Sequence, residues 1–118
     1  GQTGRWTVDP DRLTPGQRTA AASLYLALMA RTCLDLCGRG RRIVVEGPLG
    51  RNRLFGAALA QLTGVPVLAS GDATGTSLGA SLLFGGRMRE TGGGAAFEPL
   101  IATGFDPYIS NWRARVEH

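Results

Sequence analysis

An alternation of short apolar runs and helix-forming segments between residues 43 and 86 constrains the fold more than any other feature of this sequence. The runs at residues 42–46 (RIVVE) and 65–69 (VPVLA) are rich in β-branched residues and have the length of buried strands. We expect a helix after each run, over about residues 53–63 and 76–89. This spacing predicts an α/β fold whose parallel strands are joined by a right-handed crossover.

A long helix is expected before the first strand. Thr14 is a capping residue, Pro15 suits the first helical position, and Gln17 completes a capping box. The helix should run to about Cys37 and stop at a left-handed Gly38. Apolar side chains cover most of its circumference, which predicts a helix buried between layers of a larger structure. These side chains are Leu24, Tyr25, Leu26, Leu28, Met29, Leu34 and Leu36.

The two ends of the chain carry weaker signals. Residues 1–13 predict an irregular lead-in with a short strand over residues 6–8. Residues 97–105 are expected to be irregular, and a terminal helix should begin with Asp106 as its cap and Pro107 at its first position. Tyr108 and Trp112 would share one face of that helix and dock the tail.

The charge of the chain excludes two classes of chemistry. The net charge is +4, and all 13 basic residues are arginines. A Walker-type phosphate loop and a Schiff-base mechanism both need lysine, so neither operates within this chain. Five clustered arginines are either a phosphate or nucleic-acid patch or a solvated helix end. No aromatic residues interleave with them, so we favour the solvated helix end and expect no nucleic-acid partner. The cluster comprises Arg39, Arg41, Arg42, Arg51 and Arg53.

Cys33 and Cys37 lie four residues apart and would share one face of the long helix. A zinc site needs four ligands, and the others are missing, so we expect no metal site and two buried thiols in a reducing cytoplasm. No uninterrupted stretch of about 18 apolar residues occurs, and no secretion signal is visible. We therefore expect a cytoplasmic protein without a membrane span.

Two loops follow the predicted strands, at the sheet edge where parallel α/β units bind ligands. In the loop at residues 47–52, glycine lets a flat ligand or its phosphates approach the backbone, and Asn52 either caps the next helix or binds adenine or ribose. The residues alone favour capping. The loop at residues 70–77 echoes the Asp-x-Gly-Thr-Ser loops of actin-like ATPases, but with one residue too many. We interpret it as a helix start capped by Thr74 or Asp72.

Three segments in succession resemble the FGGY family of carbohydrate kinases. Residues 45–64 (VEGPLGRNRLFGAALAQLTG) are similar to the adenosine motif of that family, and residues 65–85 (VPVLASGDATGTSLGASLLFG) to the strand, acidic loop and helix that follow it. Residues 20–36 (AAASLYLALMARTCLDL) are similar to the helix that precedes the motif. The resemblance covers about residues 17–90.

The resemblance implies a partial actin-like (ribonuclease H-like) ATPase domain, with a β-α-β-α core, a preceding buried helix and a helical tail. The chain would be the C-terminal portion of the second domain, divided into a lead-in (residues 1–13), a core (14–90) and a tail (91–118). The activity implied is phosphoryl transfer from ATP, with Mg²⁺, to a hydroxyl of a sugar or polyol.

The implied nucleotide-binding residues are Gly47, Pro48, Leu49, Arg51 and Asn52. Pro48 replaces the second glycine of the family motif and has no N–H to give a phosphate, so contact must pass to Gly47 or Arg51. The resemblance places the catalytic aspartate far upstream, so we expect no catalytic residue here and no activity without the N-terminal part of the kinase. Two alternatives remain open: a non-catalytic nucleotide-binding module, suggested by Pro48, and a self-associating module that dimerises through the apolar helix.

Overall fold

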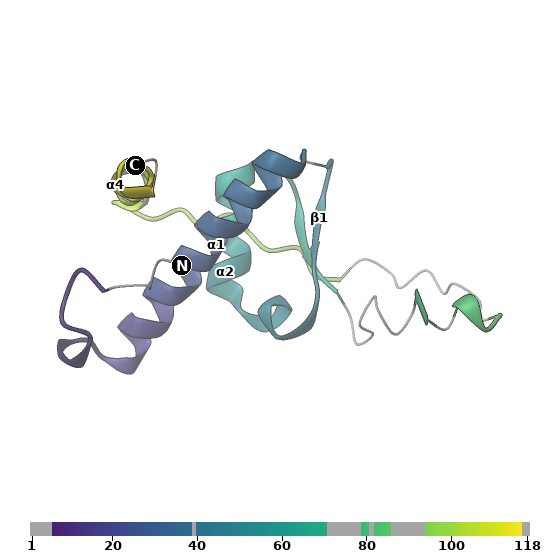
Figure 1. Ribbon diagram of the computed structural model, residues 1–118, viewed down its shortest axis with the longest axis horizontal. Coiled ribbons are helices and arrows are strands. Elements are labelled where there is room, and N and C mark those ends of the chain that lie inside the picture. Colours follow the sequence, from purple (N-terminus) through teal and green to yellow (C-terminus); the bar gives the residue numbers. More distant parts are fainter. Residues whose placement is uncertain (1–5, 39, 71–78, 81, 86–93, 117–118) are drawn as a thin grey trace.

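A computed structural model of the chain describes residues 6–38, 40–70, 79–80, 82–85 and 94–116. In Figure 1 helix α1 crosses helix α2, the strands lie beside α2, and helix α4 lies on the opposite side of α1 from the strands. The bounds are Pro15–Cys37 for α1, Ile43–Val45 for β1, Arg53–Thr63 for α2, Val67–Ala69 for β2 and Phe105–Val116 for α4. The predicted helix at residues 76–89 and loop at residues 70–77 fall largely outside the described residues.

Strands β1 and β2 pair in parallel, as the alternation of strands and helices predicted. Their register sets Ile43 opposite Val67 and Val45 opposite Ala69. Beyond the register, the Ser70 N–H donates to the Val45 carbonyl at 2.8 Å. The two strands therefore end side by side, and the chain segments that follow them leave from the same edge of the sheet.

A third segment pairs with β2, which the sequence did not predict. Ala96 forms an antiparallel bridge with Leu68. The Ala69 N–H donates to the Ala95 carbonyl at 3.0 Å, and the Phe97 N–H to the Val67 carbonyl at 2.9 Å. The tail thus covers one edge of β2 before it continues to α4.

Helix α2 has the predicted bounds. Its cap is Asn52, whose Oδ1 accepts a hydrogen bond from the Phe55 N–H at 3.0 Å, and it ends at Gly64 in the left-handed conformation, with φ 67° and ψ 14°. Side chains spaced three and four residues apart on α2 face the core, as in an amphipathic helix. The buried apolar residues of α2 are Phe55, Ala58, Leu59, Ala60 and Leu62.

Helix α1 begins with the predicted capping box. The Thr14 N–H donates to the Gln17 side chain at 2.9 Å, and the Gln17 N–H donates to the Thr14 hydroxyl at 3.2 Å. The helix ends at Cys37. Gly38 has φ 86° and ψ 126°, so its φ is positive as expected, but its ψ is extended and not left-handed helical.

The prediction that α1 is buried is wrong for the described part of the chain. Its buried residues are Ser23, Ala27 and Leu28, whereas the exposed fraction of Leu36 is 84%. The reason is geometric, because α2 covers only one stripe of α1. The same geometry makes both thiols of this helix exposed, which corrects the expectation of buried cysteines.

Helix α1 is also long and apolar enough to cross a membrane when judged by length and composition alone. The sequence expectation rested on an uninterrupted apolar stretch, and Arg31 and Asp35 interrupt this one. The mean hydropathy of the helix nevertheless stays high enough for a membrane span. A core helix of a folded domain passes the same test. Here α1 packs along α2, so its apolar stripe has a role within the domain.

The two ends of the chain correct smaller predictions. Residues 6–8 form no strand, and the first regular element among the described residues is the 3₁₀ helix η1 (Pro10–Arg12). Helix α4 begins at Phe105, so Asp106 lies in its first turn and is not its cap. The core contacts of α4 come from Phe105, Ile109 and Trp112. Tyr108 is 37% exposed, and the partial burial of its phenol raises the pKa of that group above its ordinary value.

The tail contacts α2 most closely at Gly56. A Cβ atom built on Gly56 would clash with the ring of Phe97, and the Leu100 N–H donates to the Ala57 carbonyl at 2.9 Å one residue further along the helix. Glycine normally destabilises a helix interior. At Gly56 its lack of a side chain lets the aromatic ring lie directly on the helix backbone.

We expect Gly56→Ala to destabilise the folded protein by about 1–3 kcal/mol, because the added methyl overpacks the Phe97 contact. Urea unfolding measures the change in the free energy of unfolding. In a Phe97→Ala background the same substitution should cost much less. Gly16→Ala is the matched control, because its added Cβ would lie 3.9 Å from the Thr14 hydroxyl, an ordinary contact. An equal loss of stability with and without the Phe97 ring would contradict this account.

Candidate functional site

The predicted nucleotide loop is a short 3₁₀ helix, η2 (Gly47–Arg51), at the carboxyl end of β1. The predicted loop therefore contains a regular turn, which the sequence did not specify. Pro48 lies in the first turn of η2, where a helix needs no N–H and favours the φ that proline adopts. The turn closes with a hydrogen bond of 3.0 Å from the Asn52 N–H to the Leu49 carbonyl.

Two glycines hold this turn against the end of β1. Gly47 has a φ of 70°, in the region that L-residues rarely adopt. A Cβ built on Gly50 would lie 3.0 Å from the Val45 carbonyl oxygen, which is closer than ordinary contacts. The turn therefore folds back tightly onto the strand, and its backbone lies at the surface with Gly47 exposed.

The structure brings the predicted site residues together in one surface turn. Gly47, Pro48, Leu49 and Arg51 are exposed, while Asn52 is half-buried. The turn leads directly into the N-terminal end of α2, which favours anions. Ser70, the first residue of the second predicted loop, lies at the same sheet edge through its bond to Val45. The rest of that loop is outside the described residues.

The described arginines of the predicted cluster have exposed side chains, as expected for a solvated cluster, but they lie at opposite ends of β1. Arg41 and Arg42 precede β1, whereas Arg51 and Arg53 flank the α2 cap beyond its carboxyl end. Arg39 lies outside the described residues. Within the described ranges, no group of three or more histidine, cysteine or acidic side chains is placed to hold a metal ion.

Asn52 has a structural role on both ends of its amide. Its Oδ1 caps α2, as the sequence favoured, and its Nδ2 donates to the Ser23 hydroxyl in α1 at 2.8 Å. Ser23 was missed by sequence reasoning, because 29 positions separate it from Asn52. The available signal was a small polar residue inside an otherwise apolar run, and Ser23 is indeed only 3% exposed.

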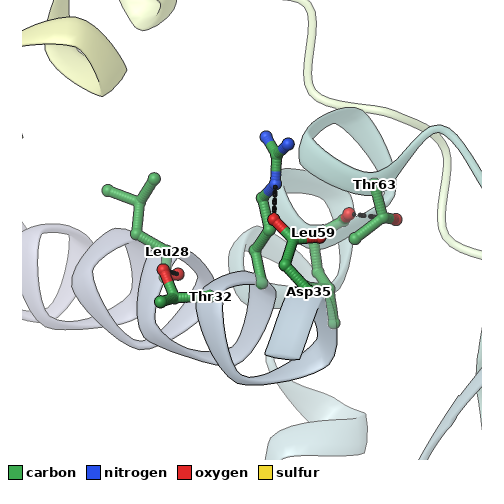
Figure 2. A network of polar contacts seen from close by, with 6 residues as sticks. Leu28, Thr32, Asp35, Leu59 and Thr63 are labelled. Atoms are coloured by element: carbon green, nitrogen blue, oxygen red, sulfur yellow. Dashed lines mark hydrogen bonds and ion pairs between the residues drawn. The ribbon is translucent and has the colours of Figure 1, made fainter. Parts of the chain in front are cut away.

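A shallow hollow of about 380 Å³ lies elsewhere, between α1 and α4. Figure 2 shows Thr32 and Asp35 of its α1 wall: the Thr32 hydroxyl donates to the Leu28 carbonyl, and Asp35 pairs with Arg31 at 3.1 Å. None of the residues that line the hollow belongs to the turn at residues 47–52. The lining residues are Leu28, Arg31, Thr32, Asp35, Trp112, Arg113 and Val116.

Comparison with known proteins identifies the family. The family profile described as "Carbohydrate kinase FGGY, C-terminal domain" matches residues 1–92, which include α1, the sheet, the turn and α2. A crystal structure of a carbohydrate kinase from Novosphingobium aromaticivorans is similar, with a TM-score of 0.68 and 37% sequence identity. The match covers 85% of this chain and 22% of that protein, so this chain spans about a fifth of its length. Among curated proteins no match was found.

These matches confirm the resemblance drawn from the sequence. The small parallel sheet and its helices are the α/β fold of the C-terminal domain of FGGY kinases. The chain therefore belongs to the FGGY family of carbohydrate kinases, as part of the C-terminal domain of such a kinase.

Proposed function

We propose that this chain is the adenosine-side nucleotide-binding portion of an ATP-dependent sugar or polyol kinase. The observation that carries the proposal is the position of η2, at the carboxyl end of a parallel strand and directly before the N-terminal end of α2. Parallel α/β sheets bind ligands at this edge. The exposed backbone at Gly47 gives a flat base or ribose close access to the turn.

The residues of the turn would contribute in different ways. Gly47 and Leu49 would lie along the nucleotide, and Asn52 would lie near the adenine or ribose. Pro48 donates no hydrogen bond, so Gly47 and Arg51 would make the polar contacts next to it. Mg²⁺ would be held by the phosphates and by residues elsewhere in the kinase, since the described residues offer no carboxylate cluster for it.

Catalysis would require the rest of the kinase. Phosphoryl transfer needs a base, metal ligands and phosphate donors arranged around the reacting atoms. The turn at residues 47–52 contains one ionisable side chain, the arginine at position 51. We therefore assign nucleotide binding to this chain and the reacting groups to the N-terminal part of the same protein.

The uncovered side of α1 supports an interface with that N-terminal part. Leu26, Cys33 and Leu36 are exposed and are spaced seven and three residues apart, so they share one face of the helix. Val44 of β1 is 49% exposed, although both faces of parallel sheets are normally covered. Self-association through the same face of α1 is the second candidate, because an exposed apolar helix face also suits a dimer.

The full-length protein with Mg²⁺ should transfer phosphate from ATP to a sugar or polyol, whereas residues 1–118 alone should show no turnover. ADP release measured across a panel of sugars and polyols tests both statements. ADP binding without turnover on any acceptor would favour the non-catalytic alternative. Turnover by residues 1–118 alone would overturn the assignment of the reacting groups to the missing part.

Pro48→Gly should tighten ADP binding to the full-length protein by about three- to tenfold, because it restores one backbone N–H beside the nucleotide. Isothermal titration calorimetry gives the dissociation constants. Pro10→Gly is a matched control, because Pro10 also lies in the first turn of a 3₁₀ helix, η1. Equal affinities of wild type and Pro48→Gly would show that no nucleotide group lies within reach of that N–H.

The reactivity of the Cys33 thiol tests what covers the exposed face of α1 that Leu26, Cys33 and Leu36 share. If the N-terminal part covers this face, Cys33 should react slowly with a maleimide in the folded full-length protein and rapidly after unfolding. Peptide mass spectrometry locates the label, and sedimentation velocity gives the oligomeric state. Slow labelling in a monomer supports the intramolecular interface. Rapid labelling in a folded monomer would contradict it, and protection that appears only with dimer formation would favour self-association.

A further inference from the structure

A chain of three hydrogen bonds connects the middle of α1 to the end of the nucleotide turn. The Ser23 hydroxyl donates to the Thr19 carbonyl within α1 at 2.8 Å. Asn52 Nδ2 donates to Ser23 Oγ at 2.8 Å, and Asn52 Oδ1 accepts from the Phe55 N–H at 3.0 Å. This series of hydrogen bonds therefore starts on the α1 backbone and ends on the α2 backbone.

This series of hydrogen bonds allows only one orientation of the Asn52 amide. A serine hydroxyl carries a single proton, and Ser23 gives it to the Thr19 carbonyl, so Ser23 Oγ can only accept from Asn52. The amide must therefore turn its NH₂ group toward α1. Its carbonyl oxygen is then the group that faces the Phe55 N–H. The donor and acceptor ends of Asn52 are therefore fixed at both partners, by the serine oxygen on α1 and by the Phe55 N–H, which can only donate.

The Asn52–Ser23 hydrogen bond is a directional contact between α1 and the α2 cap, and its surroundings on α1 are apolar. Ser23 is 3% exposed, and its neighbours on the buried stripe of α1 are the apolar Ala27 and Leu28. Apolar contacts between helices are non-directional and tolerate small shifts. Without the serine oxygen, the half-buried Nδ2 would lose its partner, and an unpaired buried donor favours rearrangement.

We propose that Ser23 is a positioning residue for the nucleotide turn. It acts through Asn52, holding the end of η2 and the first turn of α2 at a fixed place on α1, so that the backbone of residues 47–52 is preorganised for the adenosine group. The inference rests on the proposed nucleotide-binding function. It extends the binding machinery to a residue of α1 that lies 24 positions before Gly47 in the sequence.

Ser23→Ala in the full-length protein should raise the dissociation constant for ADP by about three- to tenfold, the range expected for the loss of one hydrogen bond. Ser23→Thr keeps the hydroxyl and should restore most of the affinity. The matched control is Thr63→Val, which removes a buried hydroxyl that donates to the Leu59 carbonyl at 2.7 Å in α2 (Figure 2). The control should lower the melting temperature without changing the dissociation constant.

A double-mutant cycle separates positioning from general stability. In an Asn52→Ala background, Ser23→Ala should have no further effect on ADP affinity, because the link is already broken. Hydrogen exchange of the Phe55 amide should be faster in Ser23→Ala than in wild type. In steady-state assays KM for ATP should rise with little change in kcat, because the serine touches no reacting atom.

The outcomes are distinguishable. If wild type and Ser23→Ala bind ADP equally well, the positioning role is overturned and the proposed function stands. Wild type that binds neither ADP nor ATP would overturn the proposed function and this inference together. If Ser23→Ala does not fold, Ser23→Cys replaces it, since a thiol fills nearly the same space but accepts hydrogen bonds weakly. Unchanged affinity in a folded Ser23→Cys variant would also overturn the proposal.

Discussion

The burial of one face of α2 is the interaction on which the described structure depends. Phe55, Leu59 and Leu62 are 2–6% exposed, and burying each contributes about 1.5–3 kcal/mol. Helix α1 packs on α2, β2 packs against it, and the tail crosses it at Gly56. Since η2 leads directly into α2, the place of the turn is set by this core. Apolar packing therefore sets the general place of the candidate site, and the Asn52–Ser23 hydrogen bond adds a directional contact to it.

Local signals predicted the parts of the fold that have local causes. The bounds of α2 followed from a capping asparagine and a glycine stop, and the start of α1 from its capping box. The pairing of residues 95–97 with β2 has no such signal, because three residues are too few to show a period. The exposure of α1 was also unpredictable, because apolar composition does not say which neighbours are present. Among the site residues, the turn could be predicted, while Ser23 required a contact over 29 positions.

Pro48 shows how structure changes the meaning of a substitution. From the sequence it is a departure that removes an N–H from the nucleotide loop. In the structure it lies in the first turn of η2, where its fixed φ suits the conformation and its missing N–H leaves no bond unmade. Proline also restricts the unfolded chain. The residue therefore fits a stable turn, and its effect on ligand contact is separate from its effect on folding.

Helix α1 has two faces that serve different contacts. Ser23, Ala27 and Leu28 form the buried stripe, and the serine reaches the α2 cap from there. Leu36 lies thirteen residues after Ser23, and 13 steps of about 100° place it on the far side of the helix. If a segment of the N-terminal part packs on that far side, as we propose, α1 stands between that segment and the nucleotide turn. A rigid helix in that position would make the geometry of the turn depend on how the two parts of the protein are joined.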